Sequence, residues 1–520
     1  MKNKIICLSV LAFIFAGCEP EFENELSNSS YNSGDADFSS YVAVGNSLTA
    51  GYMDGSMSRV GQSYSFPNLL AQQFAVAGGG EFTQPSYEED VNNLGGIIGI
   101  PGYGTRLIID ASAGGPEPIA GTSTITLTQQ ATAYNNMGVP GAKSFHLLAA
   151  GYGNSAGVSL GLANPYYVRH ATSPTATVLG DAMSKNPTFF TNWIGSNDVL
   201  AFATSGGVGV NQLGNFDPNT YGFNDITDPT VFASVYSQIT TTLTSGGAKG
   251  VVATIPDVTS IPFFTTVPHN PITASLIGGG NVTVGQAAIT QLNAELYGPI
   301  TQALAAFGQP DRIAPLSTSG NNPLLIVDET LTNLSAQIAG ALTQAGYPAA
   351  QAQFIGSIFG QARQATSNDL ILLSTRSVIG TAPAGIPAPF DAFGITYPLQ
   401  DQHVLTADEA DMVAEATVSF NQSIRGIAEV NNLAVADMNA ILAKLVTGLR
   451  TEDGQLYNAD YFSLSNISTV LFSLDGVHPN ARGYAVVANE IIKIINDYYN
   501  AKLPQINAGN FPGATVLPTN

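Results

Sequence analysis

The sequence predicts an α/β fold in which a parallel sheet is covered by helices. Three short apolar runs support this prediction, because each is followed by a polar turn and then by a stretch of helical pattern: residues 42–44, 188–194 and 250–256. Strands that alternate with helices in this way are typical of parallel sheets with crossover connections. Such sheets bind ligands at the carboxyl ends of their strands. The polar turns after the apolar runs are therefore the first candidates for a functional site.

The composition limits the classes of function. The chain has 520 residues, of which 44% are hydrophobic, so a large buried core can form. Charged residues make up 11%, against about 25% in an average soluble protein, which favours an extracytoplasmic protein with a neutral, hydrogen-bonding surface. The net charge of -21, with only 17 Lys and Arg, argues against a nucleic acid partner, since phosphate binding needs clustered basic residues.

The first residues have the parts of a secretory signal peptide, which we expect to span residues 1–17. Two lysines precede an apolar run at 5–15, which is too short to cross a bilayer as a helix. The run ends in Phe15-Ala16-Gly17-Cys18, which resembles a bacterial lipobox and implies cleavage before Cys18 and attachment of lipid to its sulfur. The alternative is a plain signal peptide with an incidental cysteine.

Residues 18–40 are polar and acidic, and we expect them to form a flexible tether between the lipid and the folded domain. Acidic residues directly after a lipidated cysteine resemble a surface-export signal of some Bacteroidetes lipoproteins. Cys7 and Cys18 are the only cysteines of the chain. Because Cys7 lies in the segment to be removed, the mature chain has no internal disulfide and must be stabilised by packing.

The first apolar run leads directly into a turn that carries Ser47. Gly45 and Gly51 on either side leave room around the serine hydroxyl, so another molecule could approach it closely. Ser47 is therefore a candidate nucleophile. The alternative is that Ser47 is the N-cap of the following helix. Residues 67–74 then have the pattern of a first crossover helix.

Two insertions interrupt the α/β pattern. A Gly- and Pro-rich stretch at 78–132 is expected to be a loop region, in which the Thr-rich segment 122–128 could form a hairpin strand and the acidic residues 88–90 a solvated run. The second insertion, at 262–403, is apolar and mostly helical. We expect its hydrophobic stripes to pack on the core, and the alternative is a mobile lid. The stripes are Ile289, Leu292 and Leu296; Leu331, Leu334, Ile338 and Leu342; and Phe354, Ile355, Ile358 and Phe359.

The pattern around and after the second insertion returns to strands and helices. Residues 370–373 have the pattern of a buried strand, and Thr406 to Glu409 resembles a capping box at the start of a long helix. A short buried strand is expected at 434–438, and a strong helix before Pro504. We expect residues 41–500 to form the folded domain and residues 501–520 to be a loose C-terminal tail.

Asp475 and His478 lie three residues apart on what we expect to be one tight loop. Acyl transfer to a serine needs a nucleophile, a base within hydrogen-bond reach, a group that orients the base, and donors for the oxyanion. At this spacing the Asp475 carboxylate can stand beside the His478 ring, so that His478 acts as the base and Asp475 holds its tautomer.

Four segments, in order, resemble the four blocks of the GDSL, or SGNH, hydrolase family. They are Gly45-Asn46-Ser47-Leu48, the turn at 135–141 with Gly141, Gly195-Ser196-Asn197-Asp198, and Asp475-Gly476-Val477-His478-Pro479. The resemblance covers roughly residues 41–500 apart from the two insertions. It implies a flavodoxin-like, three-layer α/β/α fold and a serine esterase or lipase that needs no cofactor.

The resemblance also implies a role for each site residue. Ser47 would be the nucleophile, His478 the base and Asp475 the acid that orients it. The oxyanion would be held by the backbone N–H groups of Ser47 and Gly141 and by the side-chain amide of Asn197, which donates without a charge that must be desolvated.

The chain departs from the family pattern at Asn46, where the family usually has Asp. Asn makes the same local turn hydrogen bonds, so we expect both the turn and the activity to survive. The other histidines are expected to be structural or loop residues, since an acid stands close in sequence only at His403, where it is Asp401. No cluster has metal-ligand spacing, so we expect no metal. These histidines are His146, His170, His269 and His403.

We therefore expect an extracytoplasmic serine esterase or lipase that is anchored to the outer membrane, or to the cell surface, through lipid on Cys18. Its substrate would be a carboxylic ester, either of a lipid or of an acylated glycan, and the sequence does not choose between them. The alternative is a non-catalytic surface lipoprotein that binds a glycan or a protein on a hydrolase scaffold.

Overall fold

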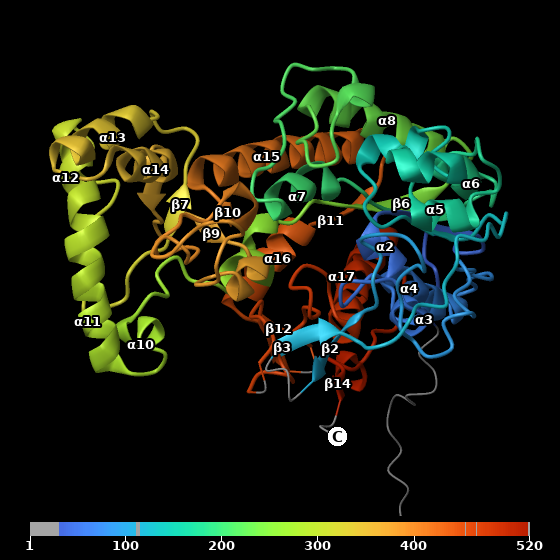
Figure 1. The fold of residues 1–520 in the computed structure, drawn as a ribbon. Helices are drawn as coiled ribbons and strands as arrows, with labels where there is room; N and C mark the ends of the chain where they lie inside the picture. Colours follow the sequence, from blue (N-terminus) through green and yellow to red (C-terminus); the bar gives the residue numbers. More distant parts are fainter. Residues whose placement is uncertain (1–30, 111–114, 453, 464, 518–520) are drawn as a thin grey trace, which may run out of the picture.

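A five-stranded parallel sheet forms the centre of the fold in the computed structural model, which describes residues 31–110, 115–452, 454–463 and 465–517 (Figure 1). The strand order is β11-β6-β5-β1-β4, and every neighbouring pair is parallel. Counted along the chain, this is the order 2-1-3-4-5 of a doubly wound sheet. The predicted α/β fold with a parallel sheet is confirmed. The strands are β1 (Tyr41–Gly45), β4 (Asn136–Gly138), β5 (Phe189–Trp193), β6 (Lys249–Ala253) and β11 (Ala434–Ala436).

The sheet strands are largely buried because helices cover both faces of the sheet. Every residue of β1 and of β5 is buried, as parallel strands between two helical layers require. The edge strand β4 was expected to be part of a turn. Its residues have low strand propensity, and it is a strand because it pairs with β1, so the sheet overrides local preference.

Helices pack on the two faces of the sheet. On one face α4 (Phe66–Ala75) packs against α17 (Ala481–Tyr499), and on the other α8 (Pro229–Thr244) packs against α15 (Ala407–Val430) (Figure 1). The predicted capping box at the start of α15 is confirmed, and in it the Glu409 carboxylate accepts from the backbone N–H and the hydroxyl of Thr406, both at 2.8 Å.

Shorter elements follow the strand ends and complete the body. No helix of the described residues is long and apolar enough to cross a bilayer. The shorter helices are α2 (Ser47–Ala50), α3 (Arg59–Ser63), α5 (Pro165–His170), α6 (Val178–Met183), α7 (Asn197–Thr204), α9 (Pro262–Thr265) and α16 (Met438–Thr447), and one antiparallel pair is formed by β12 (Leu449–Arg450) and β13 (Leu456–Tyr457).

The first insertion contains a strand pair, but not where the sequence suggested one. β2 (Leu107–Asp110) pairs antiparallel with β3 (Gly115–Pro118), whereas the Thr-rich segment 122–128 has no strand. The hydroxyl of Thr124 donates to a backbone carbonyl and the carbonyl of Thr126 accepts from Arg169. Side-chain hydrogen bonds therefore hold this segment in place of a ladder.

The acidic residues 88–90 form a solvated run only in part, because Glu88 and Glu89 are exposed but Asp90 is buried, which corrects the sequence-based expectation for Asp90. Asp90 is fully buried, and its carboxylate accepts from the backbone N–H groups of Arg59 and Leu94 at 2.9 and 2.8 Å. Glu89 forms an ion pair of 2.6 Å with the buried Arg169. The burial of Asp90 is possible because its carboxylate has N–H partners.

Both ends of the folded domain lie beyond the expected bounds of 41 and 500. Phe38 is buried and stacks on Phe74 with 4.0 Å between the ring centroids, so the core begins within the expected tether 18–40. The C-terminal tail is not loose where it is described, because β14 (Val516–Leu517) adds to β2. The expected signal peptide and Cys18 lie outside the described residues.

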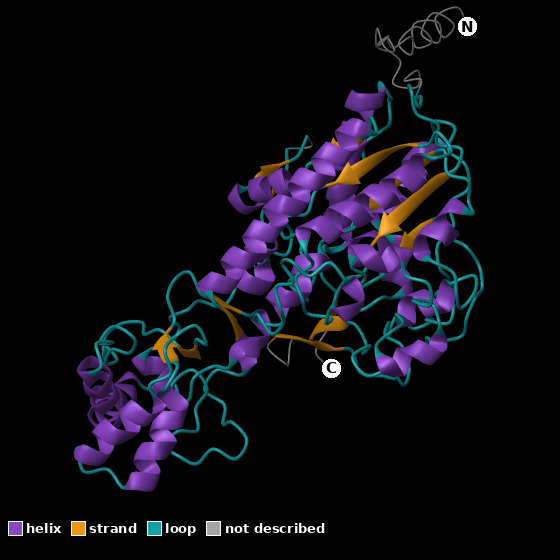
Figure 2. Cartoon of the chain, turned by 90° about the horizontal axis from the view of Figure 1, so that it is seen from above, coloured by secondary structure: helices purple, strands orange, loops and turns teal. Residues whose placement is uncertain are grey.

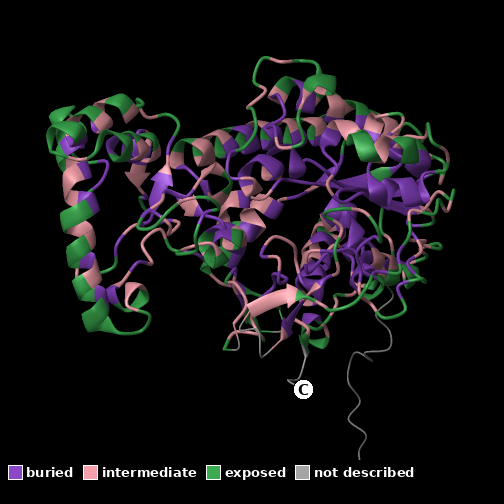
Figure 3. Ribbon diagram, in the orientation of Figure 1, coloured by how far each residue is buried: buried purple, intermediate pink, exposed green. Residues whose placement is uncertain are grey.

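The second insertion forms a separate lobe beside the body (Figures 1 and 2). Its apolar stripes face one another and build their own buried cluster, distinct from that of the sheet, so the expectation that they pack on the core was wrong. Figure 3 shows the outer faces of these helices exposed and their inner faces buried. The lobe helices are α10 (Ala274–Ile277), α11 (Val282–Leu292), α12 (Gly298–Ala306), α13 (Ser335–Gln344) and α14 (Ala349–Phe359).

Two small antiparallel pairs lie between the lobe and the body. The strand expected at 370–373 is present as β9, but it lies outside the central sheet. The pairs are β7 (Leu325–Val327) with β8 (Ala362–Gln364), and β9 (Leu370–Ile371) with β10 (Val404–Leu405).

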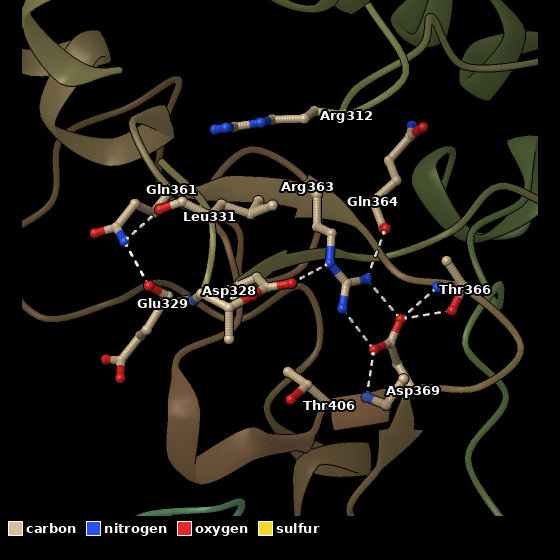
Figure 4. A network of polar contacts seen from close by, with 12 residues as sticks. Arg312, Asp328, Glu329, Leu331, Gln361, Arg363, Gln364, Thr366, Asp369 and Thr406 are labelled. Atoms are coloured by element: carbon tan, nitrogen blue, oxygen red, sulfur yellow. Dashed lines mark hydrogen bonds and ion pairs between the residues drawn. The ribbon is translucent and has the colours of Figure 1, made fainter. Parts of the chain in front are cut away.

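An ion-pair network joins these strands to the body (Figure 4). Arg363 donates from Nε to Asp328 at 2.6 Å and from its two terminal nitrogens to Asp369 at 2.6 and 2.7 Å. The Asp369 carboxylate also accepts from the N–H of Ala407 at the start of α15. Removing one partner of a buried pair leaves an unpaired charge, at a cost of about 3–5 kcal/mol. The network therefore fixes the base of the lobe to α15.

Candidate active site

The candidate site lies at the carboxyl ends of three neighbouring strands. Gly45, the last residue of β1, pairs with Gly138 of β4 on one side and with Trp193 of β5 on the other. The N–H of Val139 donates to the carbonyl of Gly45 at 3.0 Å. This register brings three of the turns singled out in the sequence to one edge of the sheet.

The turn after β1 presents the Ser47 hydroxyl because Asn46, and not Ser47, caps the short helix α2. The Asn46 side-chain oxygen accepts from the N–H of Leu48 at 3.0 Å, which leaves the serine hydroxyl for other contacts. A Cβ at Gly45 would lie 2.1 Å from the Thr49 hydroxyl and 2.7 Å from the Trp193 carbonyl. Glycine is therefore required for this turn to pack.

Ser47, His478 and Asp475 form one hydrogen-bonded chain. The distance from Ser47 Oγ to His478 Nε2 is 2.8 Å, and that from His478 Nδ1 to Asp475 Oδ2 is 3.0 Å. With the proton on Nδ1 donated to the carboxylate, Nε2 can accept from the serine hydroxyl. Both distances are within the reach that nucleophile activation by a base requires.

The Asp475 carboxylate is held by donors from two separate segments. Oδ1 accepts from the N–H groups of Val477 and His478 and from the Ser473 hydroxyl, each at 2.9 Å, and Oδ2 accepts from Gly55 N–H at 3.0 Å. Burial raises the pKa of this carboxyl, but the His478 charge and the hydrogen bonds from His478 and Val477 outweigh burial and lower the pKa to about 2. Asp475 is therefore a carboxylate at neutral pH.

A second buried acid, Asp54, supports the same loop and was not singled out in the sequence. Its backbone N–H donates to Ser473 Oγ and its side chain accepts from Leu474 N–H, both at 3.0 Å. Burial, reinforced by the nearby Asp475 charge, raises the pKa of Asp54 to about 6 despite the Leu474 hydrogen bond. In the sequence, only the Asp54-Gly55 dipeptide, which is typical of turns, indicated a structured feature at this position.

Gly141 and Asn197, which the sequence singled out as oxyanion donors, lie on the turns after β4 and around the start of α7. Asn197 Nδ2 donates to the carbonyl of Ala142 at 2.9 Å, so one of its two hydrogens ties α7 to the residue after Gly141. The Asp198 carboxylate strengthens this link, because it accepts from the N–H and the hydroxyl of Ser144 at 2.8 Å. Gly141 has φ of +80°, a left-handed conformation that glycine tolerates best.

An apolar cavity of about 110 Å³ lies beside the turn that carries Ser47. Ser47 and His478 line part of it, and Trp193 at the end of β5 lines another part. None of its described lining residues belongs to the 262–403 insertion. Most of the remaining wall comes from α16, α17 and the loops near them, including Met438, Ile441, Leu442, Leu445, Val486 and Val487.

The other histidines that are buried have structural surroundings. The His146 ring stacks on Tyr152 with centroids 4.4 Å apart and accepts from Lys143 N–H at 3.0 Å. Burial, together with the Lys143 charge, lowers the pKa of His146 to about 3. Burial likewise lowers the pKa of His170 to about 3, so both rings are neutral at neutral pH.

His403 is also tied into the backbone, where its Nδ1 accepts from Gln400 N–H at 3.1 Å. Among the described residues, no group of three or more His, Cys, Asp or Glu side chains is arranged to hold a metal ion.

Comparison with known proteins gives one distant similarity. A curated protein described as a GDSL-like esterase of Mycobacterium tuberculosis is 21% identical to this chain over 278 residues, which are 46% of this chain and 85% of that protein. No protein-family model matches the chain, and no solved structure matches it. This similarity suggests a hydrolase with a distant relation to the GDSL type.

The raised pKa of Asp54 predicts a pH-dependent stability. Between pH 4 and about 6 the folded chain binds a proton that the unfolded chain has released, so the free energy of unfolding falls as the pH rises through this window. Asp54→Asn keeps the acceptor for Leu474 and suits the φ of +54°. The free energy of unfolding of this variant, measured with urea, should exceed that of wild type by about 1–3 kcal/mol at pH 7.5 and should be close to that of wild type at pH 4.

The matched control is Asp311→Asn on an exposed turn, which should show no such pH-dependent difference. If Asp54→Asn changed the free energy of unfolding equally at both pH values, the raised pKa of Asp54 would be contradicted.

Proposed function

We propose that this protein is a serine hydrolase that cleaves carboxylic esters through an acyl-serine intermediate, with an SGNH-type site. The observation that carries the proposal is the hydrogen-bonded chain from Ser47 through His478 to Asp475, at 2.8 and 3.0 Å. The distant similarity to a GDSL-like esterase supports the same class of reaction.

In the first half of the reaction Ser47 Oγ attacks the ester carbonyl carbon while its proton passes to His478 Nε2. The Asp475 carboxylate stabilises the imidazolium that forms and keeps Nδ1 protonated. When the tetrahedral intermediate collapses, the carbon–oxygen bond to the alcohol breaks and the alcohol oxygen takes the proton from Nε2. The acyl group is then bound to Ser47 as an ester.

In the second half a water molecule attacks the acyl-serine and gives its proton to His478. Collapse of this intermediate releases the carboxylic acid and returns the proton to Ser47 Oγ. In both halves the oxyanion would be held by the N–H groups of Ser47 and Gly141 and by Asn197 Nδ2. The bond from Nδ2 to Ala142 orients this amide and leaves its second hydrogen outside that bond, as a preorganised oxyanion site requires.

The place of Asn46 is compatible with activity in this proposal. Its side chain caps α2 through its oxygen, and Asp475 supplies the charge that the base needs. Its Nδ2 is buried without a hydrogen-bond partner in the described part of the chain.

We further propose that the chain is exported and anchored to the outer membrane through lipid on Cys18. The support is the sequence alone: the apolar run, the lipobox-like Phe15-Ala16-Gly17-Cys18 and the acidic segment after it. Partitioning of wild type into a detergent phase, and of Cys18→Ser into the aqueous phase, is the test. Equal partitioning would refute the anchor.

Removal of the nucleophile tests the proposed reaction. Ser47→Ala should lower kcat on 4-nitrophenyl esters by about 10⁴-fold or more, because the members of a triad act as a unit. Ser275→Ala, at an exposed serine of the lobe, is the matched control and should hydrolyse like wild type. A wild-type chain that cleaves no ester would favour the alternative of a non-catalytic binding protein, and full activity in Ser47→Ala would refute the triad.

Removal of the amide donor tests the oxyanion site separately. Asn197→Ala should lower kcat by about 10²–10³-fold with a much smaller change in KM, because the amide acts on the charge that develops in the transition state. Circular dichroism of the variant checks that α7 is intact. A variant that loses only substrate affinity would show that Asn197 is not an oxyanion donor.

A further inference from the structure

We propose that the cavity beside Ser47 holds the acyl chain of the substrate, so that the preferred substrates are esters of medium- or long-chain fatty acids and not acetylated glycans. This inference rests on the proposed function, because it takes Ser47 to be the residue that is acylated. The sequence left open whether the substrate is an ester of a lipid or of an acylated glycan, and this inference selects the lipid.

The wall of the cavity has the chemistry of a hydrocarbon site. α16 contributes Met438, Leu442 and Leu445, and α17 contributes Val486 and Val487. The transfer of a hydrocarbon chain from water to such a wall is favourable, because it removes apolar surface from water. A sugar would lose hydrogen bonds to water there without replacing them.

The cavity is also in the right place relative to the nucleophile. Ser47 and His478 are part of its wall, and Trp193 is paired in register with Gly45, two residues before Ser47. A carbonyl carbon bound to Ser47 Oγ therefore lies at the cavity, with the following methylene groups directed along its apolar wall. An acetyl group would leave most of this space without contacts.

The acyl part of the ester, and not the alcohol, is the better occupant. The alcohol must depart after the first half of the reaction, and it takes its proton from His478 as it leaves. The acyl group stays on Ser47 until water attacks. An apolar pocket that retains the chain keeps the acyl-serine in position for this second step.

The first measurement is kcat/KM for 4-nitrophenyl esters with a constant alcohol and an acyl chain from acetyl to decanoyl. We expect kcat/KM to rise about threefold to fourfold per methylene until the cavity is filled, the gain that a buried methylene gives. A profile that peaks at acetyl, or that is flat, in a chain whose activity depends on Ser47 would overturn the acyl-chain proposal while the esterase proposal stands.

A variant that narrows the cavity locates the effect. Leu442→Phe should lower the ratio of kcat/KM for octanoyl to that for butyryl at least about tenfold. The matched control is Val446→Phe on the same helix, at a side chain that is 51% exposed, which should leave the ratio as in wild type. If Leu442→Phe and Val446→Phe had the same octanoyl to butyryl ratio of kcat/KM, the acyl chain would not bind in this cavity.

A binding measurement keeps the proposal testable without turnover. Trp193 is the only tryptophan of the chain, so its fluorescence reports on the cavity alone. In Ser47→Ala, 10-bromodecanoic acid should quench this fluorescence with saturation, unbrominated decanoic acid should reverse the quenching, and 3-bromopropionic acid should have no such effect. Absence of quenching by the long acid would overturn the proposal whether or not esters are cleaved.

Discussion

The site depends on one buried carboxylate, that of Asp475. A buried charge is tolerated only when donors surround it, and these donors come from two distant parts of the chain: Gly55 follows α2, while Ser473, Val477 and His478 lie around Asp475 itself. The contact with Gly55 joins the loop that carries His478 to the segment that follows Ser47. These donors therefore fix the loop of His478 relative to the turn of Ser47, where His478 Nε2 and Ser47 Oγ lie 2.8 Å apart.

The sheet and the lobe have separate parts in this arrangement. The register of β4, β1 and β5 brings the turns of Gly141, Ser47 and Asn197 to one edge, so backbone pairing places the three residues that we propose as oxyanion donors. The lobe has its own core and is fixed at its base by Arg363 and its two acids. Because the cavity wall comes instead from α16, α17 and nearby loops, we propose that the body of the fold, and not the lobe, selects the acyl chain.

Local patterns made the sheet and the turns predictable from the sequence. The buried runs 42–44 and 188–194 were visible because strands covered on both faces are mostly apolar, and Asp475 and His478 were visible because they share one tight loop. The packing of the lobe helices was predicted wrongly, because a helical stripe shows that a face is buried but not which surface buries it. Ser473 and Asp54 could not be assigned, since their contact joins residues 419 positions apart. The cavity could not be predicted either, because the apolar face of α16 has the same pattern as that of any core helix.

Labelling with a fluorophosphonate, followed by peptide mass spectrometry to locate the adduct, tests the proposal that His478 activates Ser47 for covalent catalysis. We expect one adduct, on Ser47, and a labelling rate at least about 10²-fold lower in His478→Ala, because the imidazole is then no longer present to remove the serine proton. An adduct on another serine, or an equal rate of labelling at Ser47 in the two proteins, would contradict the proposal.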